Sequence, residues 1–202
     1  MRKFLKRMTG IFLCVAMAAG IYGAIPAYAE GTDTGTDIQA QAAQWPTGPA
    51  AASAIIMDAS TGTVLYEKDA DTPRYPASIT KVMTTLLALE NCNLDEMVHF
   101  SATAVYENEG GTSHIARDLD EEMTLEQCLY GIMLESANEC SYAVAEHVGG
   151  GDYQKFIDMM NAKAAELGCT NTHFNNCNGL PDPAHVVSAR DMALISREAI
   201  KN

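Results

Sequence analysis

Apolar residues along the chain follow two spacings, one typical of strands and the other typical of helices. Short runs rich in branched and aromatic residues occupy 54–58 and 63–67, and a turn that ends in Gly62 separates them. This pattern predicts an antiparallel hairpin. Longer stretches with apolar residues three or four positions apart predict helices that bury one face. These stretches cover 82–89, 125–134, 139–148 and 153–167.

Polar residues and glycines mark the ends of the predicted helices. Thr124 begins one helix with Gln127 in its first turn, and Asp152 begins another that ends at Gly168. Ser188 is placed to cap a last helix that runs toward the end of the sequence. One hairpin followed by several helices predicts a single α+β domain.

A serine and a lysine three residues apart stand at the start of the 82–89 helical pattern. Side chains three apart on a helix lie on one face and lean toward its N-terminus, so the Lys81 amine can reach the Ser78 oxygen. A serine hydroxyl becomes a good nucleophile when a neighbouring base takes its proton, and burial lowers the pKa of a lysine enough for that task. The pair therefore indicates a serine acyl-transfer enzyme, although a helix cap followed by a solvated lysine also fits the pattern.

A second motif favours the catalytic interpretation. Ser136-Ala137-Asn138 lies between two helical patterns, 58 residues after Ser78. A turn at this junction presents a hydroxyl and a carboxamide side by side, although helix capping by Ser136 or Asn138 is again an alternative. The two motifs in this order are more specific than either one alone.

At these residues the chain resembles the penicillin-binding, active-site-serine family, and most closely its low-molecular-weight D-alanyl-D-alanine carboxypeptidases. The similar stretches include 76–84, 134–139 and 178–193, and the similarity runs from about residue 52 to residue 202. The resemblance implies an α+β fold of the β-lactamase/transpeptidase type, in which helices flank an antiparallel sheet.

The resemblance also implies a role for each motif residue. Ser78 matches the nucleophile that attacks the penultimate D-alanine of a peptidoglycan stem peptide ending in D-Ala-D-Ala, and Lys81 matches the base that activates it. Ser136 matches the hydroxyl that helps to protonate the departing D-alanine, and Asn138 matches the amide that binds the substrate backbone. β-Lactam antibiotics are expected to acylate the same serine, because their strained amide mimics the scissile bond.

A third motif of this family is absent from the sequence. No lysine precedes Thr-Gly or Ser-Gly, whereas the family carries Lys-Thr-Gly or Lys-Ser-Gly on an edge strand. We therefore expect a domain that is incomplete at its C-terminus, with a sheet edge left unpaired. The 202 residues alone are expected to be unstable and to have little activity. The resemblance leaves open a membrane attachment through a further C-terminal segment.

The N-terminal residues predict export. Basic residues at positions 2–7, an apolar stretch at 11–25 and the Ala-x-Ala sequence at 27–29 are the parts of a secretory signal peptide. The predicted division is a signal peptide at 1–29, a flexible linker at 30–50, and the N-terminal part of the carboxypeptidase domain at 51–202. An exported enzyme would act in the cell envelope, outside the cytoplasm.

Charge narrows the range of partners. After the predicted signal peptide, 9 basic residues face 26 acidic residues, a formal charge of −17. Such a surface repels nucleic acids and anionic membranes, so neither is expected as a partner.

Cysteine and histidine positions give little reason to expect a metal. Cys169, His173 and Cys177 have ligand-like spacing, but no fourth ligand stands near them in sequence. A Cys169–Cys177 disulfide is compatible with export. Cys128 and Cys140 fall at helical core positions, where buried thiols are common. Neither a metal nor another cofactor is expected.

Two other functions fit part of the pattern. A class A β-lactamase shares the first two motifs but needs a Glu-x-x-Leu-Asn pattern, and none follows Asn138. An inactive remnant or peptidoglycan-binding module would explain the absence of the third motif. Rapid turnover of penicillin would favour the first alternative, and a stop codon directly after codon 202 would favour the second.

Overall fold

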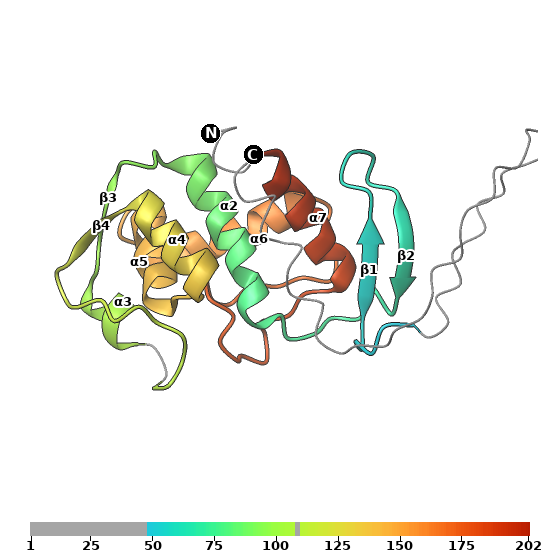
Figure 1. Ribbon diagram of the computed structural model, residues 1–202, viewed down its shortest axis with the longest axis horizontal. Helices are drawn as coiled ribbons and strands as arrows, with labels where there is room; N and C mark the ends of the chain where they lie inside the picture. The colour runs from blue at the N-terminus through green and yellow to red at the C-terminus, as the bar shows by residue number, and fades with distance from the viewer. Residues whose placement is uncertain (1–47, 108–109) are drawn as a thin grey trace, which may run out of the picture. The chain divides into compact units, whose positions relative to one another are not determined.

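The computed structural model describes residues 48–107 and 110–202, so the predicted signal peptide and nearly all of the predicted linker lie outside the described residues. Contacts divide the chain into units at Met1–Gly48 and Pro49–Asn202, and the second unit contains every element described below. Figure 1 shows these elements. In chain order they are β1 (Ala54–Met57), β2 (Val64–Lys68), the 3-10 turn η1 (Ala77–Thr80), α2 (Lys81–Asn91), β3 (Met97–His99), α3 (Ala102–Tyr106), β4 (Glu122–Thr124), α4 (Leu125–Glu135), α5 (Asn138–Gly149), α6 (Tyr153–Glu166) and α7 (Ala189–Lys201).

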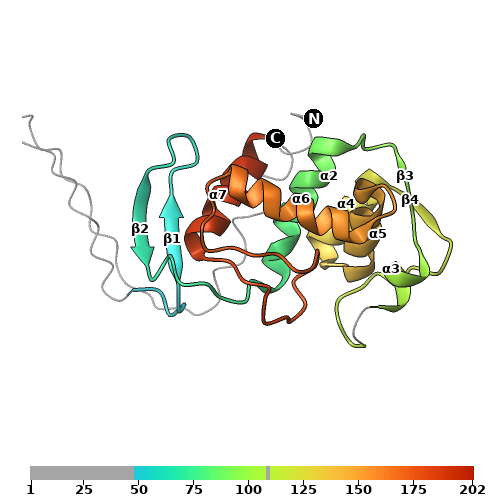
Figure 2. The same cartoon turned by 180° about the vertical axis from the view of Figure 1, so that it is seen from behind.

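Helix α2 lies at the centre of the unit, with α4, α5, α6 and α7 packed around it (Figures 1 and 2). Two hydrophobic clusters meet along this helix. Met83, Leu86 and Leu87 belong to the cluster shared with α6 and α7, whereas Ala88 belongs to the cluster shared with α4 and α5. Since α2 is covered on several sides, the residues at its first turn are held in a rigid and largely dry setting.

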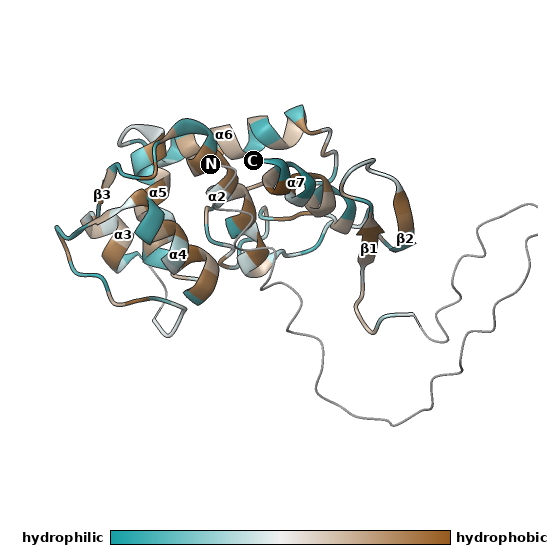
Figure 3. Ribbon diagram, turned by 45° about the horizontal axis from the view of Figure 1, so that its top comes forward, coloured by the Kyte–Doolittle hydropathy of each residue, from teal (hydrophilic) through white to brown (hydrophobic). Residues whose placement is uncertain are grey.

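The predicted hairpin is present as β1 and β2, which pair in antiparallel register with Ile55 opposite Glu67. Helix α7 packs against β1, and its Arg190 forms ion pairs with Glu67 and Asp71. Figure 3 shows that α7 carries both hydrophilic and hydrophobic residues, as expected for a helix with one buried face. On the hairpin, Leu65 remains 65% exposed.

A second, smaller sheet was not predicted. Strands β3 and β4 have three residues each and pair in antiparallel register through Val98 and Met123. They lie at the side of the helices opposite the β1–β2 hairpin (Figure 1). Within 48–107 and 110–202, each helix is too short or too polar to span a lipid bilayer.

The predicted helix starts are confirmed at three positions. Thr124 accepts a hydrogen bond from the Gln127 backbone N–H, Asp152 caps α6, and Ser188 caps α7. Gly168 follows α6 with a φ of 81°, the left-handed conformation that ends many helices.

Candidate active site

Ser78 lies in η1, directly before the central helix α2. Its side chain is exposed, and the preceding residue, Ala77, has a φ of 50°. A left-handed conformation at a residue other than glycine costs conformational energy and is concentrated at functional sites. The sharp turn at Ala77 places the Ser78 hydroxyl at the surface while the helix that follows it is buried.

Lys81 is the first residue of α2 and is only 2% exposed. Its Nζ lies 3.2 Å from the Ser78 Oγ, 2.8 Å from the Asn138 Oδ1 and 2.8 Å from the Asn178 carbonyl oxygen. The amide and carbonyl oxygens can only accept hydrogen bonds. When the amine is neutral, its two N–H bonds satisfy these two acceptors, and its lone pair is left facing the Ser78 hydroxyl.

The surroundings of Lys81 favour the neutral form of its amine. Burial lowers the pKa of Lys81 to about 8, because an ammonium group loses its hydration inside the protein. Burial also raises the pKa of the neighbouring Cys177 thiol to about 12, so this thiol is uncharged where Lys81 titrates. The buried carboxylate of Glu139 is then the nearby charge that opposes deprotonation of Lys81.

Ser136 and Asn138 reach the same point from the junction of α4 and α5. Ser136 ends α4 with a φ of 57°, and its Oγ donates a hydrogen bond to the Ser78 Oγ at 2.9 Å. Asn138 begins α5 and is 4% exposed, with its Oδ1 accepting from Lys81. The four residues predicted from the two motifs therefore lie together, although their catalytic roles stay predictions.

Side-chain capping of a helix N-terminus does not describe these residues, although Ser136 occupies the C-cap position of α4 through its backbone. No side-chain hydrogen bond caps η1 or α5, and the residues at those cap positions are Pro76 and Ala137. The interpretation of Lys81 as a solvated surface lysine is wrong, because its side chain is buried between α2, α5 and the 175–187 loop.

Backbone groups of the 175–187 loop hold the first turn of α2, and sequence reasoning did not identify them as part of the site. The Thr84 Oγ1 donates to the Cys177 carbonyl oxygen at 2.6 Å. Thr84 lies three residues after Lys81 on α2, and Lys81 bonds to the next carbonyl of the loop, that of Asn178. Carbonyl groups carry no residue-type signal, so the only sequence cue was the similarity of the 178–193 stretch.

Gly179 lies against the backbone of the nucleophile turn. Its φ is 89°, and a Cβ added there would lie 1.9 Å from the Ala77 carbonyl oxygen and 3.0 Å from the Ser78 nitrogen. Only glycine permits this approach, since any side chain would force the loop and the turn apart. Gly179 thus fixes the distance between the loop that binds Lys81 and the turn that carries Ser78.

His185 anchors the same loop to η1. Its ring is 1% exposed, its Nδ1 accepts the Asn175 N–H at 3.0 Å, and its Nε2 lies 2.8 Å from the Thr80 Oγ1. Because Nδ1 is an acceptor, Nε2 carries the proton and donates it to Thr80. Burial lowers the pKa of His185 to about 4, so the ring is neutral in the folded protein.

This histidine predicts a pH dependence of folding stability. As the pH falls from 6.5 to about 4, the unfolded chain binds a proton at His185 while the folded chain does not, so the free energy of unfolding decreases. His185→Gln retains a hydrogen-bond donor but cannot titrate. We expect the wild type to lose more of its melting temperature than this variant across that window. Equal losses would show that His185 does not bind a proton on unfolding.

Five cysteines lie in the described residues, and one of them, Cys177, is a neighbour of Lys81. All five described cysteines are free, so a Cys169–Cys177 disulfide is not formed. Cys128 and Cys140 are fully buried, as predicted. Cys169, His173 and Cys177 do not come together, and among the described residues a different set of possible metal ligands does, namely Cys92, Glu96 and His147.

Comparisons with known proteins point to one family. The family model described as D-alanyl-D-alanine carboxypeptidase matches residues 39–202. The D-alanyl-D-alanine carboxypeptidase DacF of Bacillus subtilis is 39% identical over 153 residues, which are 75% of this chain and 39% of DacF. A curated D-alanyl-D-alanine carboxypeptidase of Streptomyces is 35% identical over 196 residues, covering 92% of this chain and 62% of the relative.

A solved structure shows the same arrangement of helices and strands. The D-alanyl-D-alanine carboxypeptidase DacD of Francisella tularensis is 34% identical, with a TM-score of 0.73 over 84% of this chain and 41% of DacD. The predicted β-lactamase/transpeptidase-like α+β fold is thereby confirmed. The aligned part of the chain spans less than two thirds of each of these relatives.

Proposed function

The chain belongs to the D-alanyl-D-alanine carboxypeptidase family, and we propose that the complete gene product is a serine-type D-alanyl-D-alanine carboxypeptidase. Its substrate is a peptidoglycan stem peptide that ends in D-Ala-D-Ala, and its product is the peptide shortened by one D-alanine. The observation that carries the proposal is the buried Lys81 amine, held by two acceptors and placed 3.2 Å from an exposed serine hydroxyl.

In the proposed acylation step, the neutral Lys81 amine takes the Ser78 proton as Oγ attacks the carbonyl carbon of the penultimate D-alanine. Asn138 binds the substrate backbone through its side-chain amide. The negative charge that develops on the carbonyl oxygen is stabilised by the backbone N–H of Ser78 at the start of η1.

The departing D-alanine needs a proton on its nitrogen. Ser136 supports this transfer, because its Oγ lies 2.9 Å from the Ser78 Oγ and therefore beside the bond that breaks. The proton held by Lys81 passes to the leaving nitrogen with Ser136 as the intermediate donor. Water then attacks the Ser78 ester, and the shortened peptide leaves with the serine hydroxyl restored.

The same geometry supports reaction with β-lactams. Their ring amide presents a carbonyl to Ser78, but the ring nitrogen stays attached to the acyl group after the bond breaks. It therefore cannot diffuse away as D-alanine does. A long-lived acyl-enzyme is expected, in contrast to the rapid turnover that a β-lactamase would show.

An exported enzyme fits this substrate, and we include export through a signal peptide at 1–29 in the proposal. The basic, apolar and Ala-x-Ala segments of the sequence support it. Location in the cell envelope follows from the substrate, which is part of the cell wall. Attachment to the membrane remains a prediction of the family resemblance.

The direct test is release of D-alanine by the complete gene product from a synthetic peptide that ends in D-Ala-D-Ala. The matched control peptide ends in D-Ala-L-Ala and should release nothing. Absence of both D-alanine release and a penicillin adduct would contradict the proposal and favour a peptidoglycan-binding module. Hydrolysis of penicillin over many turnovers would favour a β-lactamase.

Gly179 provides a test of the supporting loop. Gly179→Ala should slow acylation by penicillin about 100-fold, because a displacement of about 1 Å at a reacting group has an effect of that size. The measurement is the rate of covalent labelling at a fixed penicillin concentration.

Gly168→Ala is the matched control for that variant. Gly168 also has a positive φ, 81°, but nothing lies within 4 Å of an added Cβ, so labelling should stay within a few-fold of the wild type. Equal rates in both variants would show that the contact between Gly179 and Ala77 does not position the nucleophile.

A further inference from the structure

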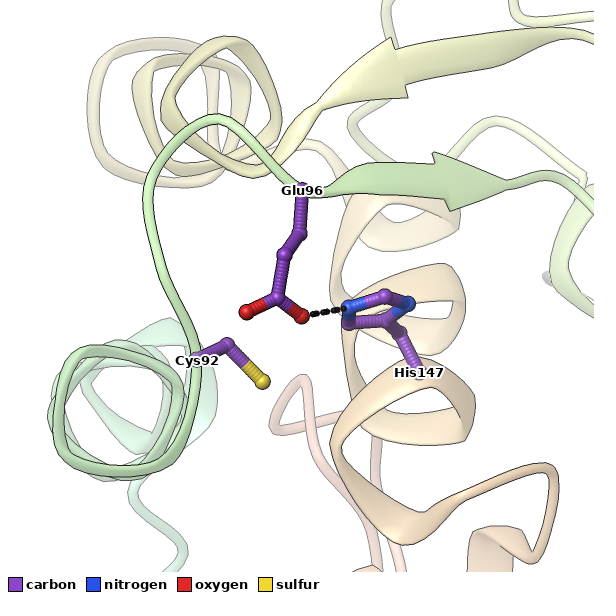
Figure 4. A group of neighbouring side chains, drawn as sticks. All are labelled: Cys92, Glu96 and His147. Atoms are coloured by element: carbon purple, nitrogen blue, oxygen red, sulfur yellow. Dashed lines mark hydrogen bonds and ion pairs between the residues drawn. The ribbon is translucent and has the colours of Figure 1, made fainter.

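Three side chains that differ in chemistry converge at the end of α2 opposite to the serine site. They are Cys92, Glu96 and His147, and one ligand atom from each lies within 4.8 Å of the other two. Figure 4 shows the thiol, the carboxylate and the imidazole directed into a common space. The side chains of His147 and Glu96 are 24% and 36% exposed, so an ion can enter from solvent.

The backbone holds the three residues in place. Cys92 caps the C-terminus of α2 through its N–H bond to the Ala88 carbonyl at 3.0 Å. Glu96 precedes β3, and its carbonyl oxygen accepts the Leu125 N–H at 2.8 Å. His147 lies in the last turn of α5. The ligands therefore come from two packed helices and a short turn that is tied to α4.

Asn93 orients the carboxylate of Glu96. The Glu96 Oε1 accepts the Asn93 backbone N–H at 2.6 Å and the Asn93 Nδ2 at 3.0 Å. This leaves the Oε2 facing His147, whose Nε2 is 2.9 Å away. Ligating carboxylates in metal proteins are commonly held by such outer hydrogen bonds.

We propose that Cys92, Glu96 and His147 form a zinc site, with water as the fourth ligand. A thiolate, a carboxylate and an imidazole are the three types of side chain that bind Zn²⁺, and tetrahedral coordination needs only one more ligand. The thiolate and the carboxylate together balance the charge of the ion. Mg²⁺ and Ca²⁺ prefer all-oxygen sites, so this mixed set selects against them.

Binding changes a small number of bonds. The Cys92 Sγ, Glu96 Oε2 and His147 Nε2 each bond to the ion. The hydrogen bond between Glu96 and His147 is lost, and the ring proton of His147 moves through solvent from Nε2 to Nδ1. The Cys92 thiol gives up one proton to solvent when its sulfur bonds to the ion, because the thiolate is the form that binds metals. Zinc bonds of about 2.0–2.3 Å require the ligand atoms to move together by about 1 Å.

The zinc site is separate from the serine chemistry. Lys81 and Cys92 lie at opposite ends of the 11-residue helix α2, about 16 Å apart along its axis. Zinc at this point ties the end of α2 to the end of α5. Because the ion binds the folded chain, it should raise the melting temperature.

The test uses the complete gene product after removal of bound metal with a chelator. Titration with Zn²⁺ should give one ion per chain and a higher melting temperature. Co²⁺ as a substitute should give the intense charge-transfer absorption of a cobalt–thiolate bond. Absence of that absorption in a protein that binds Co²⁺ would overturn the assignment of Cys92 as a ligand.

Variants identify the ligands. Cys92→Ser and His147→Gln should each weaken zinc binding by more than about 100-fold, since even changes in outer-shell partners cost about 10–100-fold. The control is Cys169→Ser, which removes another partly buried thiol and should leave zinc binding unchanged. Zinc binding that is retained in Cys92→Ser, or equally lost in Cys169→Ser, would overturn the proposal. Failure of the wild type to bind zinc would do so as well.

Discussion

Ser78→Ala should abolish covalent labelling of the complete gene product by a fluorescent penicillin. The Ser78 Oγ is the hydroxyl that the Lys81 amine contacts, and the Ser136 hydroxyl donates a hydrogen bond to that same oxygen. Removal of a serine nucleophile lowers the rate by a factor on the order of 10⁶ in a well-studied serine peptidase. The expected result is therefore no labelled band after an exposure that labels the wild type fully.

The matched control for this variant is Ser60→Ala. Ser60 is an exposed serine in the β1–β2 turn, where its hydroxyl bonds to Asp58. The same chemical change at that position should leave labelling unaltered. Labelling that survives in Ser78→Ala at a rate near that of the wild type would remove Ser78 from the proposed mechanism.

Lys81→Ala should slow acylation by about 10²–10⁴-fold, the usual contribution of a general base. The variant loses the only amine near the Ser78 hydroxyl among the described contacts, while Ser136 and the substrate-binding surface remain. Reversible binding of a peptide ligand should therefore change much less than acylation. The measurement is the acylation rate constant as a function of penicillin concentration, which separates binding from the covalent step.

Folding of the Lys81 variant has to be checked, because the lost amine leaves the Asn138 Oδ1 and the Asn178 carbonyl without a donor. A cooperative melting transition would show that the domain is intact. Lys68→Ala, at an exposed lysine of β2, controls for general loss of positive charge. Acylation of Lys81→Ala within tenfold of the wild-type rate would contradict the assignment of Lys81 as the base.

Local signals in the sequence were sufficient for most of the helices and for the first hairpin. The starts of α4, α6 and α7 were predictable because Thr124, Asp152 and Ser188 each bond to the backbone N–H three residues further on. Strands β3 and β4 were missed because three residues are too few to establish an alternating pattern. Their pairing also joins Val98 to Met123 across an intervening helix.

The candidate site also contains residues that the sequence predicted and groups that it did not predict. Ser78 and Lys81 are three residues apart at the start of a predicted helix, and the Ser-x-Asn turn falls between two predicted helices, so both motifs could be identified from the sequence. The acceptors supplied by Cys177 and Asn178 are backbone carbonyls about 95 residues away from their partners, and they leave no trace in residue type.

At Gly179, the sequence indicates a turn but not the contact that the turn makes. A glycine followed by two prolines at 179–183 is typical of a rigid turn. The close approach of Gly179 to Ala77 was not predictable, because it depends on how the turn packs against η1. The Cys92, Glu96 and His147 group was missed for a related reason, since His147 is far from the other two residues in sequence.

The pH dependence of the acylation rate tests the central claim, that a neutral lysine amine activates the serine, most directly. Burial lowers the pKa of Lys81 to about 8, and only the deprotonated amine can accept the Ser78 proton. The acylation rate constant of the wild type should therefore rise with pH through a single ionisation near 8 and then level off. A rate constant that stays flat across that range, or falls as the pH rises, would contradict the account.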